Sequence, residues 1–296
     1  MTLAPGGVGR NIAETLARLG AETRLLSAVG DDHFGAIVLE ETRSAGVLVD
    51  GVIRTAGRTG VYLSAADAEG ALATAISDMD ICELITPAYL ASREETLSAS
   101  AFIIADTNIP AESLSFLSRL AAARSIPFLI EPVSVQKGRK ILSVDGPIRY
   151  ITPNLGELRG LTGVPAALGR TGCADGPDEA GPPGIPESVG GRYLAVMRER
   201  LPLVGSAIVT MGSAGSVLMD AKTGSIIRIP SIPVTVADPN GAGDAFVAGF
   251  VAGLINGLPA EEAMRYGSAA ASITLASPDS VAADISIDRV RRMAGK

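Results

Sequence analysis

Short apolar runs alternate along this chain with longer segments in which apolar residues recur every three or four positions. The short runs predict buried strands, and the longer segments predict helices. Strands are expected at about 23–29, 101–105, 127–130, 150–152, 206–210 and 217–220, with a β-rich run at 226–236. Helices are expected at about 12–19, 36–45, 112–124, 189–201, 245–258 and 261–276, with a short basic helix from 285. This alternation predicts an α/β fold whose sheet is mostly parallel, with right-handed crossovers.

Two segments depart from the alternation. Residues 52–75 change repeatedly between short β-like runs and turns, and a turn at 67–70 would close a hairpin. A hairpin inserted between α/β units is a candidate lid. Residues 164–187 are crowded with glycine and proline, which predicts a flexible surface insertion and not a domain boundary. We therefore expect one domain over residues 1–296.

Composition and charge exclude several classes of protein. The chain has 25 Lys and Arg against 32 Asp and Glu, a formal charge of −7, no Trp and no basic stripe, which argues against nucleic-acid binding. Cys82 and Cys173 lie far apart and form no metal-type spacing, which favours a reducing, cytoplasmic compartment. No apolar run is long enough to span a bilayer, so no membrane partner is expected.

Two enzyme classes lack their motifs in this chain. The one histidine, His33, follows two acids in a turn and is expected to be a solvated loop residue, which disfavours a histidine-dependent hydrolase triad. No GxxxxGK[ST] motif occurs, so a P-loop kinase is excluded.

The segment 237–246, Ala-Asp-Pro-Asn-Gly-Ala-Gly-Asp-Ala-Phe, carries the strongest chemical signal. It predicts a glycine-rich turn that opens a helix, where unpaired N–H groups and the positive end of the helix dipole favour an anion. Gly241 and Gly243 would let a phosphate approach the backbone closely. Asp244 would then accept the proton of a hydroxyl that attacks a phosphoryl group. The alternative is a β-turn followed by a buried helix, with Asp244 as a capping acid.

Three further sets of residues are candidates for binding. Glycines and Asn11 at 5–11 open a helix, but the third glycine of a dinucleotide fingerprint is missing, so an NAD-dependent oxidoreductase is disfavoured. Asp106 and Asn108 follow a buried strand and could meet substrate hydroxyls. Asn154 and Glu157, three residues apart at a helix start, could hold the water shell of Mg²⁺. They could equally form a capping box, and the two roles are compatible.

Three motifs stand in one order along the chain: the glycine-rich opening from Gly6 to Asn11, the pair Asn154 and Glu157, and the segment 238–246. Together they resemble the ribokinase family, also called the PfkB carbohydrate and nucleoside kinases. The resemblance covers nearly the whole chain, and the segment around Asp244 is its most specific part. It implies a three-layer α/β sandwich with a small β lid, ATP-dependent phosphorylation of a primary hydroxyl on a sugar or nucleoside, and Mg²⁺ as cofactor. Relatives often dimerise through the lid, which makes a homodimer through residues 52–75 an expectation.

The resemblance also assigns roles to residues, with Asp244 as the base. It implies an anion hole at Gly241, Ala242 and Gly243, Mg²⁺ at Asn154 and Glu157, and a monovalent cation such as K⁺ at Asp238 and Asn240. It places the nucleotide at Thr210, Gly212, Gly215 and Ser272. It places the sugar at Gly6, Gly7, Asn11 and Asn108.

Within the family, several stretches are similar to pseudouridine kinases, including 60–63, 75–81, 85–87, 131–137 and 275–281. The resemblance therefore favours phosphorylation of pseudouridine to pseudouridine 5′-phosphate.

Two features depart from the family pattern. Relatives carry a strand before the first glycine motif, so we expect this chain to be truncated, and Pro239-Asn240 replaces a commoner Thr-Thr or Thr-Ser pair. The alternatives are another sugar kinase of the family and a catalytically impaired relative that only binds a nucleoside.

Overall fold

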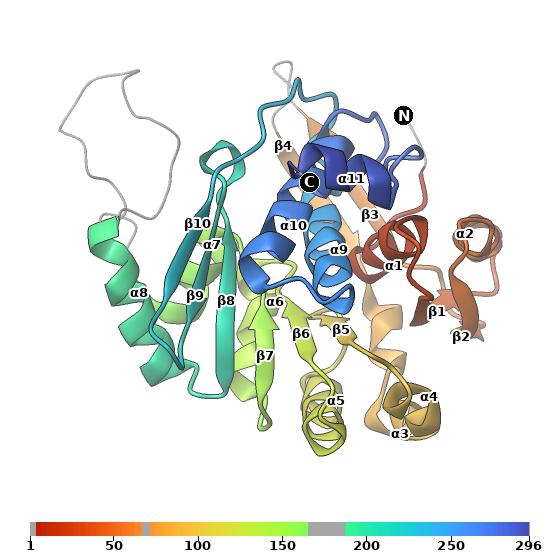
Figure 1. Ribbon diagram of the computed structural model, residues 1–296. Coiled ribbons are helices and arrows are strands. Elements are labelled where there is room, and N and C mark those ends of the chain that lie inside the picture. Colours follow the sequence, from red (N-terminus) through yellow and green to blue (C-terminus); the bar gives the residue numbers. More distant parts are fainter. Residues whose placement is uncertain (1–3, 67–71, 165–186, 296) are drawn as a thin grey trace.

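The computed structural model describes residues 4–66, 72–164 and 187–295 (Figure 1). The turn predicted at 67–70 and nearly all of the insertion predicted at 164–187 lie outside these residues.

Six strands of the described chain form the central sheet, in the order β10-β9-β8-β7-β6-β5. Strands β5 (Ile103–Asp106), β6 (Phe128–Glu131), β7 (Ile148–Ile151) and β8 (Val204–Thr210) are parallel. Strands β9 (Ser216–Asp220) and β10 (Ile226–Ile229) run antiparallel at one edge. The predicted mostly parallel sheet is therefore confirmed. Strand β10 is shorter than the β-rich run expected at 226–236, because Pro230 has no N–H to continue the ladder.

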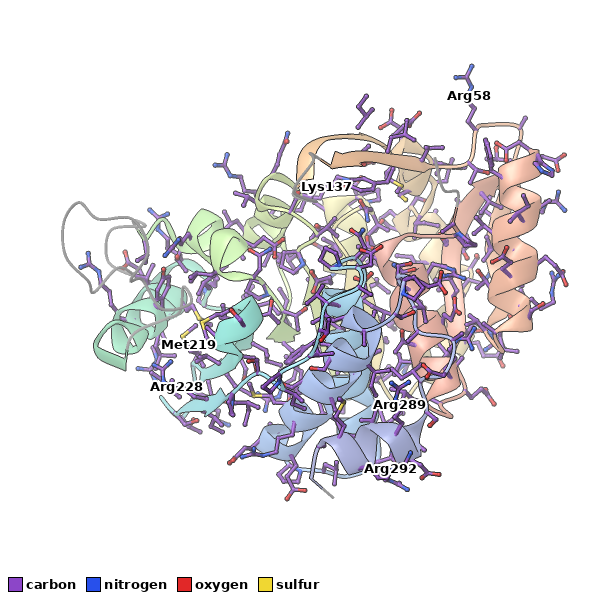
Figure 2. The ribbon with its side chains drawn as sticks, turned by 90° about the horizontal axis from the view of Figure 1, so that it is seen from above. Arg58, Lys137, Met219, Arg228, Arg289 and Arg292 are labelled. Carbon is purple, nitrogen blue, oxygen red and sulfur yellow. The ribbon has the colours of Figure 1, made fainter. Side chains whose placement is uncertain are left out.

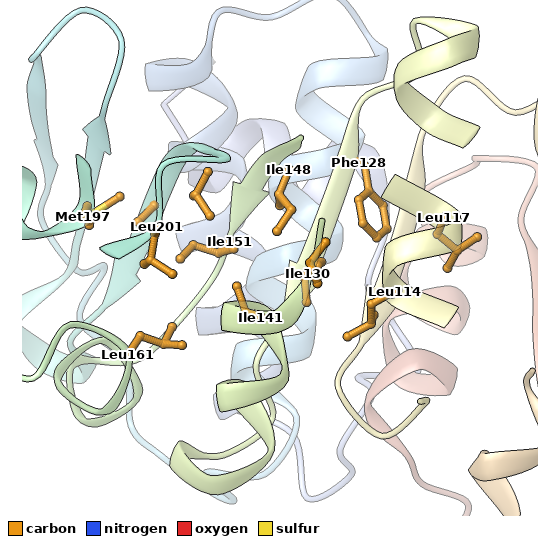
Figure 3. Packing of buried hydrophobic residues seen from close by; sticks show 14 of the residues in the cluster. Leu114, Leu117, Phe128, Ile130, Ile141, Ile148, Ile151, Leu161, Met197 and Leu201 are labelled. Atoms are coloured by element: carbon orange, nitrogen blue, oxygen red, sulfur yellow. The ribbon is translucent and has the colours of Figure 1, made fainter. Parts of the chain in front are cut away.

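Successive side chains along the strands point to opposite faces of the sheet and pack into two separate hydrophobic cores. Phe128 and Ile130 point to one face, and Leu129 between them points to the other. The first face packs under α5 (Ala111–Arg124), α7 (Leu155–Thr162) and α8 (Glu187–Arg200), and Figure 3 shows Leu114 and Leu117 of α5 beside Phe128. The second face packs under α1 (Val8–Arg18), α9 (Ala242–Ile255), α10 (Ala260–Leu275) and α11 (Ile287–Met293). The result is a three-layer sandwich with helices on both faces (Figure 1).

Two smaller strand pairs lie beside the central sheet. Strands β1 (Arg24–Gly30) and β2 (Leu48–Thr55) are parallel, with α2 (His33–Ser44) between them in sequence. Strands β3 (Val61–Ala66) and β4 (Leu72–Asp78) form an antiparallel pair. Residues 52–55 of the segment predicted as a lid thus belong to β2.

Short helices connect the remaining elements. They are η1 (Asp80–Leu84), α3 (Pro87–Ala91), α4 (Glu94–Ser98), α6 (Val135–Gly138), η2 (Arg139–Ser143) and η4 (Gly212–Ala214). Helix α2 begins at His33 and not at residue 36, because the Asp32 side chain accepts from the Gly35 N–H and caps the helix there. His33 is exposed, as expected, but it starts a helix and does not lie in a loop.

Candidate active site

Helix α9 begins at the glycine-rich turn, three residues earlier than its apolar pattern indicates. Gly241 precedes the helix with a φ of 77°, in the left-handed region that favours glycine. A Cβ added to Gly241 would lie 1.8 Å from the backbone oxygen of Ser280, so both conformation and space require glycine there. The first helical hydrogen bond joins the Ala245 N–H to the Gly241 carbonyl, at 2.8 Å. The N–H groups of Ala242, Gly243 and Asp244 therefore have no partner within the helix and are free to bind an anion.

Gly243 is exposed on this first turn, and a Cβ added to it would meet nothing within 4 Å. Its φ is outside the left-handed region, so the backbone would accept any residue. The protein therefore leaves open space directly above the free N–H groups, where the phosphoryl group of a ligand could approach the backbone.

Asp244 lines a cavity of about 190 Å³ beside that open space. Its carboxylate accepts a hydrogen bond from the Asn11 side-chain amide, with an Nδ2–Oδ2 distance of 2.8 Å. The pKa of the Asp244 carboxyl is raised to about 7, mainly by burial; the Asn11 hydrogen bond lowers it and the charge of Asp106 raises it. A carboxylate with this pKa is suited to accept a proton near neutral pH.

The walls of the cavity come from five regions that are distant in sequence. The lining residues are Val8, Glu131, Val133, Thr152, Asn154, Glu157, Thr210, Gly243, Asp244 and Val247. Four residues singled out in the sequence, Asn154, Glu157, Thr210 and Gly243, thus meet Asp244 around one space.

Glu131 is an acidic residue of this cavity to which the sequence assigned no role. Its carboxylate accepts from the Thr152 hydroxyl and from the Val133 N–H, the latter at 3.3 Å. Burial raises the pKa of Glu131 well above its ordinary value, and the charges of Glu157 and Asp244 add to this rise. Val133 has a φ of 63°, which is costly for a β-branched residue, as found where a site imposes its own geometry.

Asn154 and Glu157 form the capping box at the start of α7. The Asn154 side chain accepts from the Glu157 N–H and the Glu157 side chain accepts from the Asn154 N–H, both at 2.9 Å. Burial raises the pKa of Glu157, and the hydrogen bonds from Asn154 lower it. Both side chains line the cavity, and Glu157 uses only its Oε2 atom in the box, so capping leaves its second carboxylate oxygen for another ligand.

Asp106 binds the start of α1 and Asn108, one of the residues expected to bind the sugar. Its carboxylate accepts from the N–H groups of Gly9, at 3.0 Å, and Asn108, at 2.8 Å. Burial raises the pKa of Asp106, and the hydrogen bonds from Asn108 and Gly9 lower it. The Lys137 amino group donates to the Asn108 side-chain oxygen at 2.6 Å. Figure 2 shows Lys137 well within the outline of the molecule seen from above, whereas Arg58 projects from its rim.

Gly7 and Gly6 occupy the turn that opens α1. Gly7 has a φ of 110° and its carbonyl accepts from the Asn11 N–H at 2.8 Å, which places Asn11 one turn into the helix. Gly6 is exposed, and a Cβ there would meet nothing within 4 Å.

Of the residues that the resemblance assigns to the nucleotide and to the monovalent cation, five do not line the cavity. Gly212 and Gly215 form the turn between β8 and β9, and Gly215 packs against the Ile229 carbonyl. The Ser272 hydroxyl donates to the Ile232 carbonyl at 3.1 Å. Asp238 and Asn240 form a local turn in which one Asp238 oxygen accepts from the Asn240 N–H and side-chain amide, both at 2.8 Å.

The sequence missed Glu131 and the orientation of Asn11. The signal for Glu131 was present, since it ends a buried strand as Asp106 does, and ligands bind beyond such strand ends. The contact between Asn11 and Asp244 joins residues 233 positions apart and has no local signal.

The site combines free helix N–H groups, a carboxylate with a pKa near neutrality and two further acids. In the described part of the chain, these acids form no cluster of three or more His, Cys, Asp or Glu that could hold a metal ion directly. The arrangement suits transfer of a phosphoryl group, in which positioning and electrostatics dominate. No helix among the described residues has the length and apolarity to cross a membrane.

Comparison with known proteins gives consistent results. The family described as pfkB family carbohydrate kinase matches this chain over residues 1–286. The pseudouridine kinase of Escherichia coli (strain K12) is 34% identical over 287 residues, covering 97% of this chain and 84% of that protein. The ribokinase of Bacillus subtilis (strain 168) is 28% identical over 276 residues, covering 92% of this chain and 82% of that protein.

Solved structures share the fold. A carbohydrate kinase from Agrobacterium tumefaciens matches with a TM-score of 0.76 and 31% identity, covering 98% of this chain and 86% of that one. Arabidopsis thaliana ribokinase, solved with ribose and ATP, matches with a TM-score of 0.81 and 22% identity, covering 98% of this chain and 88% of that one. These matches confirm the ribokinase-like sandwich expected from the sequence.

Proposed function

This chain belongs to the pfkB family of carbohydrate kinases, and from that premise we propose that it phosphorylates the primary hydroxyl of a nucleoside, pseudouridine, with Asp244 as the base. Members of the family are ATP-dependent kinases of sugars or nucleosides that work with a divalent metal. The observation that supports Asp244 as the base is the position of its carboxylate at the start of α9, beside free N–H groups and open space.

In the proposed reaction, the substrate hydroxyl gives its proton to Asp244 as its oxygen forms a bond to the γ-phosphorus of ATP. The bond from that phosphorus to the bridging oxygen breaks at the same time, and ADP leaves with the electron pair. Asp244 must be ionised to accept the proton. Because its pKa is about 7, a large fraction is ionised at neutral pH, and the protonated acid is strong enough to release the proton afterwards.

The N–H groups at the start of α9 would stabilise the charge of the transferred group. Gly241, Ala242 and Gly243 supply backbone donors at the positive end of a 14-residue helix. Gly243 adds no side chain that would block their approach. These donors are fixed before the reaction, so no reorganisation is needed when charge develops.

The acids around the cavity fit a divalent cation. Glu157 is buried and Glu131 is half-buried, and both have a raised pKa that a nearby positive charge would lower again. We assign Mg²⁺ to this position, held by Asn154 and Glu157 through its water shell, with Glu131 as a further acid on the same wall. The bound ion would neutralise charge on the phosphates of ATP.

The nucleotide and the sugar are proposed to enter from different sides. Thr210 ends β8, its N–H donates to the Pro153 carbonyl at 3.1 Å, and it lines the cavity. The nucleotide would extend from there past Gly212, Gly215 and Ser272. The sugar would lie at Gly6, Gly7, Asn11 and Asn108. Asp238 and Asn240 are retained as the position for a monovalent cation such as K⁺.

Pseudouridine is favoured because the E. coli pseudouridine kinase shares 34% identity over almost the whole chain. A sugar is the alternative, and the similarity to ribokinases supports it. ADP release with ATP and Mg²⁺ should be measured for pseudouridine, uridine, adenosine, ribose and fructose at equal concentration. We expect the highest kcat/KM for pseudouridine. Turnover of another compound with none of pseudouridine would reject the substrate and leave the kinase assignment in place.

The hairpin of β3 and β4 is proposed as the lid of a single domain and as a dimer interface. It exposes Val61, Tyr62, Leu63 and Ile76, and the side chain of Ile76 is 66% exposed. Large apolar side chains grouped on one hairpin are typical of a surface that another chain covers.

Because ATP is the phosphate donor, we also propose a cytoplasmic location.

A further inference from the structure

The two ends of the Asn11 side-chain amide face groups of opposite charge. The Nδ2 atom donates to Asp244 at 2.8 Å, and the Oδ1 atom accepts from the Arg10 Nη1 atom at 3.3 Å. A guanidinium can only donate hydrogen bonds, and an ionised carboxylate can only accept them. The amide therefore has one orientation that satisfies both neighbours, with its oxygen toward Arg10 and its NH₂ toward Asp244.

Arg10 is itself held rigidly. Its side chain is buried, and each of its three nitrogens has a different partner. The Nε atom donates to the Thr42 hydroxyl at 3.2 Å, Nη1 donates to Asn11, and Nη2 forms an ion pair with Glu14. The Thr42 hydroxyl donates to the Val38 carbonyl at 2.6 Å, so its lone pairs are left for Arg10. Helices α1 and α2 together fix the guanidinium behind Asn11.

We propose that Arg10 is a positioning residue for phosphoryl transfer, which holds the Asn11 amide in the orientation that donates to the Asp244 carboxylate. The inference rests on the proposed role of Asp244 as the base. Arg10 does not line the cavity, so it acts through Asn11 and not on the reacting atoms.

Loss of Arg10 has a predictable electrostatic consequence. Without a donor behind it, the Asn11 amide can rotate and use its oxygen to accept a hydrogen bond from the protonated form of Asp244, which favours that form. Asp244 would then lose the hydrogen bond that lowers its pKa. Removing a hydrogen bond to a charged group should raise that pKa by about one to two units.

Other charges around these groups stay in place when Arg10 is changed. Asp244 faces Asp106 of β5, and its charge also reaches Glu131 of β6. Arg10 faces Glu14, Glu41 and Arg18. Glu14 keeps its ion pair with Arg18, at 2.8 Å, so the helix retains one partner for this buried acid.

The test is the pH dependence of kcat/KM in Arg10→Met and Arg10→Lys, with the best substrate of the panel. Activity needs ionised Asp244, so a raised pKa moves the acidic limb of the profile to higher pH. We expect Arg10→Met to move this limb up by about one unit or more. Arg10→Lys keeps a donor-only cation and should lie between Arg10→Met and the wild type. An acidic limb of Arg10→Met that coincides with that of the wild type overturns the inference.

Two further variants separate positioning from folding. Arg18→Met removes the other ion pair of Glu14 without touching Asn11, so it should lower the Tm and leave the acidic limb unchanged. The double variant Arg10→Met/Glu14→Gln removes the charge of the acid that Arg10 paired with, together with the arginine, and it should show the same shifted limb in a stably folded chain. A shift in Arg18→Met as large as that in Arg10→Met would contradict a specific role for Arg10.

A direct titration distinguishes this inference from the function on which it rests. The carbon-13 resonance of the Asp244 carboxyl, assigned by its absence in Asp244→Asn, should titrate at higher pH in Arg10→Met. If Asp244→Asn keeps its turnover, the base assignment and this inference both fall. If Asp244→Asn is inactive and the resonance titrates as in the wild type, only the role of Arg10 falls.

Discussion

Replacing Gly243 by alanine separates the anion site from the stability of the fold. The new methyl group meets no protein atom within 4 Å, and the backbone conformation accepts alanine. Alanine in place of glycine within a helix stabilises it by up to about 1 kcal/mol, because the unfolded chain has less conformational freedom to lose. The Tm of Gly243→Ala should therefore equal or exceed that of the wild type.

Activity should change in the opposite direction. The methyl group enters the space from which a phosphoryl group must approach the N–H groups of the first turn. Loss of a single donor in a comparable anion hole lowers kcat by about 10²- to 10³-fold, or roughly 2.7–4 kcal/mol of transition-state stabilisation. We expect kcat/KM of Gly243→Ala to fall by at least about 100-fold.

A coupled assay of ADP release and a thermal denaturation curve on the same samples test both parts. Gly191→Ala is the matched control, since Gly191 is also an exposed helical glycine whose added Cβ meets nothing within 4 Å. It should gain stability without losing activity. Gly241→Ala should instead lower the Tm, because its Cβ collides with the Ser280 carbonyl. Wild-type turnover by Gly243→Ala would refute phosphoryl binding at the start of α9.

Three further predictions concern the acids and the hairpin. Between about pH 4 and pH 7, folded Asp244 holds a proton that the unfolded chain has released; the free energy of unfolding should fall as pH rises through this window, and a denaturant series should show that Asp244→Asn removes this part of the fall. Glu157→Gln can still accept from the Asn154 N–H, so its Tm should hold while the Mg²⁺ concentration for half-maximal rate rises; an unchanged Mg²⁺ dependence would exclude Glu157 from the metal site. Ile76→Asp should convert a dimer to a monomer in light scattering, and a dimer of unchanged affinity would place the interface elsewhere.

The sequence was sufficient for most of the fold because each element carries its own periodic signal. The buried runs at 127–130 and 206–210 became β6 and β8 within a few residues. The predicted start or end of an element was wrong where a single polar or proline residue determines it. The Asp32 cap starts α2 early, and Pro230 ends β10 early. The division of the strands into a central sheet and two separate pairs depends on contacts distant in sequence, which periodicity does not encode.

The candidate site was predictable only in part, for the same reason. Asn154 and Glu157 are three residues apart at a helix start, so the spacing alone predicted both the capping box and the shared face of the helix. The pKa of Asp244 could not be read in this way, because it results from burial between α9 and α1 and from the nearby charge of Asp106. Arg10 gives no sign in the sequence that its side chain is buried and turned toward Asn11.

The central claim is that Asp244 removes a proton from the substrate hydroxyl, and Asp244→Asn tests it most directly. The variant keeps the shape of the side chain and removes its basicity. We predict that kcat falls by about 10²- to 10⁴-fold while the Tm stays at or above that of the wild type and ATP binding, measured by calorimetry, is retained. A kcat close to that of the wild type in a folded, ATP-binding Asp244→Asn would contradict the account.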